Sequence, residues 1–231
     1  MKMKQFFKAI PLLLSVLANP TLASETFTYT FLEGEAVKND SSESGFAWDG
    51  HGWIGGDYNK FSWKTEGETH EGELDEAEVR ALYSRLIAPF WDLQAGVRYD
   101  FEPEGLAYAT IGVSGLAPYL FEVDAAAFLS EEGDVSARIE LEYELLFTQR
   151  LIGSPHLEVE AFVSDVPELG MGSGLAIMEL GFQLRYEVTR KLAPYIDLTY
   201  EHSYGGTADY ARAAGEGVES TAFHFGLRII F

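Results

Sequence analysis

The segment SARIELEYELLF, residues 136–147, alternates between apolar and charged side chains along most of its length. Every second residue from Ala137 to Phe147 is apolar, and the residues between them include Arg138 and three glutamates. Successive side chains of a β-strand point to opposite faces, so this pattern predicts a long strand with one wholly apolar face. A helix with the same sequence would spread these charges around its whole axis.

The same period of two recurs in the segments 91–101, 119–127, 180–188 and 221–231. Such strands fit either a soluble β-sandwich, with its apolar face turned inward, or a membrane β-barrel, with its apolar face turned to lipid. The expected strands are mostly about 10–13 residues long, enough for a tilted strand to cross a bilayer. Aromatic residues gather at their ends, as in the interfacial girdles of membrane proteins. The sequence therefore predicts an all-β fold, a transmembrane antiparallel β-barrel.

We expect twelve strands, with ten as the alternative because the first strand has the weakest pattern. Three short turns repeat a Leu/Ile-Ala-Pro-aromatic sequence at 87–90, 116–119 and 192–195. Longer polar connections alternate with the short turns, for example at 67–76 and 205–220. Bacterial barrels place short turns on the periplasmic side and long loops outside. The expected strands are 26–36, 46–56, 59–67, 76–86, 89–101, 106–114, 118–129, 135–147, 150–163, 174–188, 193–204 and 220–231.

The first residues have the pattern of an export signal. Three lysines lie within the first eight residues, an apolar run follows at 9–17, and small residues at Thr21 and Ala23 suit a cleavage site. The apolar run is much shorter than the roughly 20 residues that a membrane-spanning helix needs. We therefore predict a secretory signal peptide at 1–23, a barrel domain at 24–231, and a location in the outer membrane of a Gram-negative cell.

The composition excludes several classes of function. The chain has 37 Asp and Glu residues against 16 Lys and Arg residues, a formal net charge of −21, and no Cys. A strongly acidic chain does not suit nucleic acid as a partner, because phosphate binding needs a basic surface. Without cysteine there is no disulfide framework, thiolate metal site or thiol nucleophile.

If the apolar rows face lipid, the charged rows face the lumen, where carboxylates exceed bases about two to one. Two interpretations of this interior remain open. The long side chains could fill a narrow barrel with ion pairs and form a plug, or the carboxylates could concentrate cations and form a cation-selective path. The candidate residues for the cation path are Asp92, Asp100, Glu122, Asp124, Glu144 and Glu187.

Several segments together have a recognisable sequence and follow one another in a recognisable order. They are 52–60, 64–68, 81–85, 87–98, 115–119, 148–151 and 205–211. These segments resemble the copper resistance protein B family of bacterial outer-membrane proteins. The resemblance implies an outer-membrane barrel linked to copper tolerance, which moves or sequesters copper at the cell envelope. It implies copper ions as transient ligands, no organic cofactor, and outer-membrane lipid and periplasmic copper proteins as candidate partners.

Many members of this family carry a segment rich in Met and His before the barrel, whereas residues 24–35 of this chain contain neither residue type. A high-capacity copper store is therefore not expected here. If copper passes through the barrel, imidazole and carboxylate suit Cu(II), and a thioether suits Cu(I). The alternative is that the histidines are ordinary hydrogen-bonded lumen residues. The candidate ligands are His51, His224, Glu140 and Glu142 for Cu(II), and Met171 in an outer loop for Cu(I).

Two other classes of function are alternatives to transport. The first is a plugged structural barrel whose loops bind a partner. The second is a lipid-modifying outer-membrane enzyme, which would need a nucleophile paired with a histidine. None of the five histidines has a serine two residues later, the spacing that places both side chains on one face of a strand. His202 and Ser203 fall on opposite faces, so we do not expect an enzyme.

Overall fold

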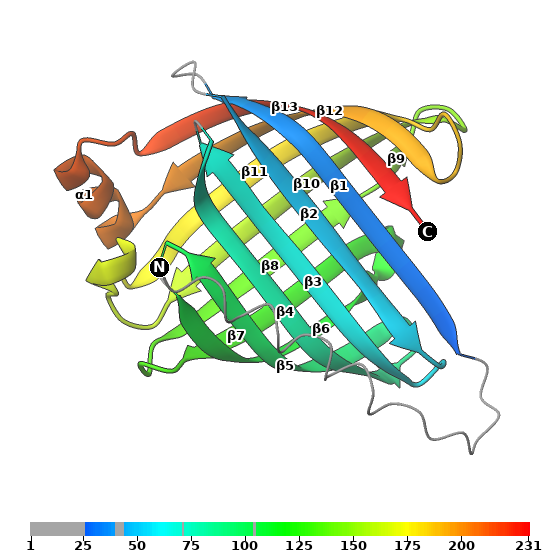
Figure 1. Cartoon of the computed structure of the whole chain (residues 1–231), viewed down its shortest axis with the longest axis horizontal. Helices are drawn as coiled ribbons and strands as arrows, with labels where there is room; N and C mark the ends of the chain where they lie inside the picture. Colours follow the sequence, from blue (N-terminus) through cyan, green and yellow to red (C-terminus); the bar gives the residue numbers. More distant parts are fainter. Residues whose placement is uncertain (1–25, 40–43, 71, 104) are drawn as a thin grey trace, which may run out of the picture.

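The computed structural model describes residues 26–39, 44–70, 72–103 and 105–231, and the predicted signal peptide lies outside them. The strands are β1 (Phe27–Asn39), β2 (Ser44–Gly55), β3 (Asn59–His70), β4 (Glu73–Ala88), β5 (Trp91–Glu102), β6 (Leu106–Ala117), β7 (Phe121–Ser130), β8 (Val135–Tyr143), β9 (Leu145–Leu146), β10 (Leu151–Phe162), β11 (Gly174–Tyr186), β12 (Leu192–Ser203) and β13 (Glu219–Ile230). They form one antiparallel sheet, and β13 pairs with β1 to close it into a barrel (Figure 1).

β8 and β9 are two parts of a single strand that crosses the barrel wall. Both pair with β10, and only Glu144 separates them. The wall therefore contains twelve strands, which confirms the predicted fold class and the predicted strand number. The boundaries of most strands lie within a few residues of those predicted from the alternation.

The two faces of the sheet are distributed as in a membrane barrel. Polar side chains such as Arg80 (2% exposed) and Ser154 (1% exposed) are buried inside, whereas Val97 and Ile111 on the outer face are 59% and 57% exposed. A water-soluble protein shows the opposite distribution, because it buries apolar side chains and exposes charges. The apolar rows therefore form the outer surface of the barrel and the charged rows face the lumen.

The connections at one rim of the barrel are all short, and the two longest connections lie at the other rim. Residues 56–58 connect β2 to β3, and residues 89–90 connect β4 to β5, at the rim where β1 begins and β13 ends. The opposite rim carries the connections at 163–173 and 204–218. We call these the short-turn rim and the loop rim. The predicted division into short turns and longer loops holds, with two differences at the loop rim.

The first difference concerns residues 67–76, where a long polar connection was expected. Instead β3 continues to His70 and pairs with the start of β4 at Glu73. The hydroxyl of Thr69 donates a hydrogen bond to the backbone carbonyl of Phe46 on β2, 3.1 Å away. The predicted loop is therefore wrong, because a strand that extends beyond the bilayer can be polar on both faces, as a loop is.

The second difference concerns residues 205–220, where a loop was expected and a helix, α1 (Gly205–Ala214), is found beside β11 and β12. Gly215 ends this helix in a left-handed conformation, and its N–H donates to the carbonyls of Ala211 and Arg212. Two short 3-10 turns, η3 (Pro118–Leu120) and η4 (Pro167–Leu169), complete the connections. Within the described ranges, no helix combines the length and the apolar character needed to cross a membrane.

The outward orientation of the apolar rows can be tested at Ile111, which lies midway along β6 with its side chain on the outer face. We expect Ile111→Arg to lower the free energy of unfolding in lipid vesicles by about 2–4 kcal/mol, because it places a charge in hydrocarbon. Urea titration followed by tryptophan fluorescence measures this change. The matched variant Ser114→Arg puts the same charge into the lumen from the same strand and should cost much less. Equal losses at both positions would contradict the assignment of the two faces.

Candidate functional site in the barrel lumen

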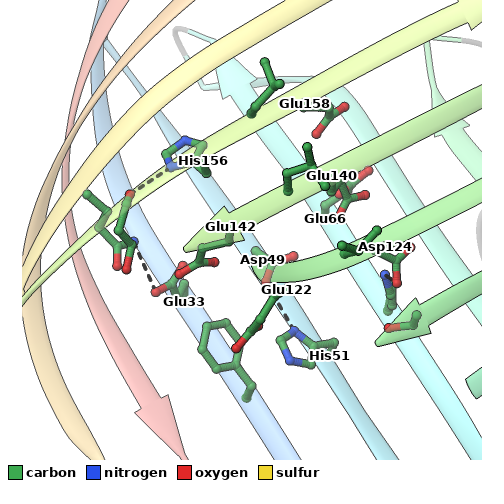
Figure 2. Close-up of a pocket in the computed structure, with 18 of the residues that line it drawn as sticks. Glu33, Asp49, His51, Glu66, Glu122, Asp124, Glu140, Glu142, His156 and Glu158 are labelled. Atoms are coloured by element: carbon green, nitrogen blue, oxygen red, sulfur yellow. Dashed lines mark hydrogen bonds and ion pairs between the residues drawn. The ribbon is translucent and has the colours of Figure 1, made fainter. Parts of the chain in front are cut away.

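The lumen contains a cavity of about 860 Å³ whose charged lining is strongly acidic. Side chains from both walls project into it, and Figure 2 shows His51, Glu122 and Glu142 pointing into the same space. The charged and ionisable lining consists of twelve carboxylates, three bases and three histidines. These are Glu33, Glu35, Asp49, Glu66, Asp92, Glu122, Asp124, Glu140, Glu142, Glu158, Glu179 and Asp197; Lys60, Lys64 and Arg228; and His51, His156 and His224.

Five carboxylates form a continuous row across neighbouring strands, which we call the acidic row. Asp124 on β7 is directly opposite Glu140 on β8, and Glu140 is opposite Glu158 on β10. Glu158 is in turn opposite Glu179 on β11, which is opposite Glu201 on β12. Asp124 lies near the short-turn end of its strand, whereas the last member lies near the loop rim. The acidic row therefore runs along the inner wall from the short-turn rim toward the loop rim. Its members are Asp124, Glu140, Glu158, Glu179 and Glu201.

Like charges directly opposite each other on a sheet repel, so the acidic row needs cations to stabilise it. Lys64 Nζ lies 2.7 Å from Asp124, and Arg138 Nε lies 3.2 Å from Glu158. Arg80 contacts Glu140 more loosely, at 3.8 Å. The protein thus supplies basic partners unevenly. Lys64 and Arg80 reach the row from β3 and β4 on the other side of the lumen, whereas Arg138 lies on β8 within the row itself.

The strongest neutralisation lies toward the loop rim, where Arg80, Arg98 and Arg138 gather in what we call the arginine cluster. Arg98 forms an ion pair with Glu78 at 2.8 Å, and Arg80 also pairs with Glu78. The guanidinium groups of Arg98 and Arg80 lie over the ring of Phe128, 4.8 and 5.1 Å from its centroid. Cation–π packing and charge pairing together make this part of the lumen dense.

The predicted cation-path residues fall into three environments. Asp92, Glu122 and Asp124 line the main cavity. Asp100 instead accepts two hydrogen bonds from Arg98, at 2.6 and 2.8 Å, and so belongs with the arginine cluster. A smaller cavity of about 240 Å³ at the short-turn rim holds the remaining two predicted residues, Glu144 and Glu187.

Four of the five predicted copper ligands line the main cavity. His51 stacks on the ring of Phe31 with a centroid distance of 4.4 Å, and its Nδ1 lies 3.7 Å from Asp49. His224 on β13 is separated from β2 only by β1, and it is held by Glu35 at 2.9 Å. Glu140 and Glu142 lie on β8, across the lumen from both histidines. Across the described part of the chain, no three His, Asp or Glu side chains form a closed metal site.

Met171, the fifth predicted ligand, lies outside this cavity in the loop between β10 and β11. It packs against the buried side chains of Phe162 and Val166. The same loop is fixed by the backbone N–H of Ser173, which donates to Asp165 at 2.7 Å; this hydrogen bond lowers the pKa of the Asp165 carboxyl. The thioether therefore contributes to apolar packing in the loop.

His156 was not among the predicted ligands, yet it lies in the cavity beside carboxylates. Its Nε2 is 3.8 Å from both Glu179 and Asp197. The sequence contains a signal for this position, because His156 precedes Glu158 and Glu160 at intervals of two and so shares their face. By contrast His202, the residue tested for enzymatic activity, hydrogen-bonds to Tyr200 and lies near Glu219 at the loop rim.

Comparison with known proteins gives a consistent family relationship. The family model described as Copper resistance protein B precursor (CopB) matches residues 27–231. The chain is 42% identical over 189 residues to the Copper resistance protein B homolog of Pseudomonas syringae pv. tomato, covering 81% of this chain and 64% of that protein. It is 40% identical over 198 residues to Copper resistance protein B of Escherichia coli, covering 85% of this chain and 67% of that protein. The chain thus spans about two thirds of the length of these relatives.

Solved structures give the same fold at low sequence identity. The NanC porin superimposes with a TM-score of 0.60 and 14% identity, covering 86% of this chain and 98% of that chain. The KdgM porin superimposes with a TM-score of 0.56 and 11% identity over the same shares of the two chains. At these identities the similarity establishes the barrel architecture, which agrees with the inside-out distribution of side chains.

The contribution of the arginine cluster can be measured with Arg138→Met. Arg138 is shared by Glu66, Glu158 and Glu160. It also lies 3.5 Å from the buried Glu78, so its removal takes a major cation away from this whole group of carboxylates. We expect a loss of about 3–5 kcal/mol in the free energy of unfolding, measured by urea titration in vesicles. The control Arg212→Met removes an exposed ion pair on α1 and should change stability little. If Arg138→Met is as stable as the unsubstituted protein, the cluster does not stabilise the fold.

Proposed function

Because the chain belongs to the copper resistance protein B family, we propose that it acts in copper resistance at the outer membrane and conducts copper ions through its acidic lumen. The observation that carries this proposal is the lining of the main cavity, where twelve carboxylates face three lysine and arginine residues. Export would be directed by the predicted signal peptide at 1–23, which is removed before the barrel inserts.

The physical basis is electrostatic. Barrel walls of low dielectric constant focus the field of the carboxylates into the lumen, which raises the local concentration of cations and excludes anions. Cu(II) accepts imidazole and carboxylate ligands, so His51, His224, Glu140 and Glu142 are suitable transient partners on its way through. Met171, packed in its loop, would at most meet Cu(I) near the loop rim.

The acidic row supplies a series of neighbouring sites along which a cation can move. Conduction requires that an ion be attracted into the lumen and yet be released from each site, which several weak sites in succession permit. Asp124 and Glu158 are paired with bases, whereas Glu201 near the loop rim has no ion pair among the described residues. A periplasmic copper protein would meet this path at the short-turn rim, which would face the periplasm.

The arginine cluster favours a second candidate function, a plugged barrel that binds a partner without transport. Arg80 and Arg98 pair with the buried Glu78 toward the loop rim, and Phe128 beneath their guanidinium groups is only 1% exposed. In this alternative the cluster closes the lumen and the acidic cavity is open only toward the short-turn rim. Neither candidate function requires enzymatic chemistry.

Conductance in planar lipid bilayers separates the two candidate functions. We expect the unsubstituted barrel to carry a cation-selective current, and the triple variant Glu140→Gln, Glu158→Gln, Glu179→Gln to lose most of that selectivity because three charges of the acidic row are removed. The matched control neutralises three exposed loop residues, Glu132, Glu168 and Glu216. A bilayer that stays closed with correctly folded protein would support the plug and exclude transport.

The role in copper tolerance can be tested in the cell. We expect deletion of the gene to change both growth and cell-associated copper across a series of copper concentrations. Complementation with the unsubstituted gene should restore both, whereas the triple variant of the acidic row should restore them only partly at the same level of folded protein. Unchanged growth and unchanged copper content in the deletion strain would contradict a role in copper resistance.

A further inference from the structure

We infer that His156, His224, Asp197 and Glu179 form a Cu(II)-binding site midway along the lumen, an inference that rests on the proposed function. The four side chains come from β10, β11, β12 and β13 and all line the main cavity. Nε2 of His156 lies 3.8 Å from both Asp197 Oδ2 and Glu179 Oε1. Asp197 is directly opposite His224 on the neighbouring strand, and such partners have Cβ atoms about 5 Å apart.

Both histidines present the same nitrogen to the lumen. Nδ1 of His224 donates to Glu35 Oε1 at 2.9 Å, and Nδ1 of His156 donates to the backbone carbonyl of Ser154 at 3.4 Å. With the proton on Nδ1, each Nε2 carries a lone pair that can bind a metal. A hydrogen bond from the remote ring nitrogen to a carboxylate or carbonyl is the arrangement that orients metal-binding histidines.

The hydroxyl of Thr199 occupies the position that a metal would take on His224. Its Oγ1 lies 3.1 Å from Nε2 of His224, and since Nδ1 carries the proton, the hydroxyl donates to Nε2. This contact shows that the lone pair of His224 faces β12, where Thr199 lines the same cavity, and that it accepts a hydrogen bond there. A bound copper ion would take the place of the Thr199 hydroxyl as the partner of the lone pair on Nε2 of His224.

Asp197 provides an independent indication of a missing partner. The residue is only 9% exposed, and its Oδ1 is buried without a hydrogen-bond partner among the described residues. A buried carboxylate oxygen without a partner is costly, and a bound cation would satisfy it. Asp197 Oδ2 lies 3.8 Å from Nε2 of His156, and Asp197 is directly opposite His224 on the next strand. A cation held by Asp197 would therefore meet His156 directly and reach His224 through side-chain movement.

The surrounding wall is shaped to hold these rings. Gly181 lies directly opposite His156, and a side chain at Gly181 would collide with the imidazole. Gly226 likewise makes room for the ring of Tyr195, whose hydroxyl donates to Glu35 at 2.8 Å. Tyr195 therefore fixes Glu35, which in turn fixes the ring of His224.

The geometry suits a cargo ion better than a permanent cofactor. With metal–ligand bonds of about 2.0–2.2 Å, neighbouring ligand atoms lie roughly 3–4 Å apart, which includes the 3.8 Å separations around His156. Two nitrogens and two oxygens form the tetragonal set that Cu(II) prefers. Among the described residues, no three of these side chains surround a common point at the distances of a formed metal site. The site is therefore open. An open site binds by side-chain movement and can release its ion, as conduction requires.

The test measures Cu(II) binding to the full-length folded barrel in detergent, by chelator competition and by pulsed electron paramagnetic resonance. We expect imidazole nitrogen signals in the unsubstituted protein. His156→Ala and His224→Ala should each weaken Cu(II) binding at least tenfold and reduce these signals. The positioning variant Glu35→Gln should weaken binding by about 10–100-fold while the nitrogen signals remain. Folding of each variant is checked by the change in gel mobility on boiling, and His156→Gln replaces His156→Ala if the latter does not fold.

A control variant makes the result specific. His202→Ala removes an imidazole that hydrogen-bonds to Tyr200 at the loop rim, outside the lining of the main cavity. It should bind Cu(II) as the unsubstituted protein does. Undiminished binding in His156→Ala and His224→Ala, or no Cu(II) binding by the folded barrel, overturns the site. If cation current and copper tolerance persist in that case, the proposed function stands without this site. If the site binds copper but the gene deletion has no effect, the function fails instead.

Discussion

The contact between the strands and the hydrocarbon of the bilayer is the constraint on which the rest of this structure depends. Apolar rows must face lipid, and because side chains alternate along each strand, every row between them is forced into the lumen. In a barrel of twelve strands the interior is narrow, so long charged side chains from facing walls reach one another. The ion pairs, the cavity and the histidines of the lumen all follow from this enclosure.

The enclosed charges are neutralised unevenly, and this unevenness gives the lumen two different parts. Toward the loop rim, the arginine cluster packs on Phe128 and pairs with Glu66 and Glu78. Around the main cavity, carboxylates exceed the remaining bases by twelve to three. Dense ion pairs stabilise one part, whereas the other retains a negative potential that attracts cations. The two functional alternatives, a plug and a cation path, thus correspond to two regions of the same interior.

Much of the architecture could be predicted from the sequence because a period of two directly reports which face each side chain takes. The strand around Arg138 and the cavity position of Glu140 both follow from that alternation. What alternation cannot report is which residues meet across the lumen, since this depends on how the sheet closes. Arg138 and Glu66 are 72 positions apart and still form an ion pair, and His156 meets Asp197 from a strand two places away.

The enclosure of the carboxylates in a water-filled lumen can be measured directly with single cysteine variants, because the chain contains no cysteine. Ile139→Cys and Glu140→Cys alter adjacent residues on opposite faces of β8. In vesicles, a water-soluble maleimide that does not cross membranes should modify the Glu140→Cys variant and leave the Ile139→Cys variant unmodified. A label at 139 alone should be quenched by brominated lipid. The reverse pattern, or equal reactivity at both positions, would contradict the account.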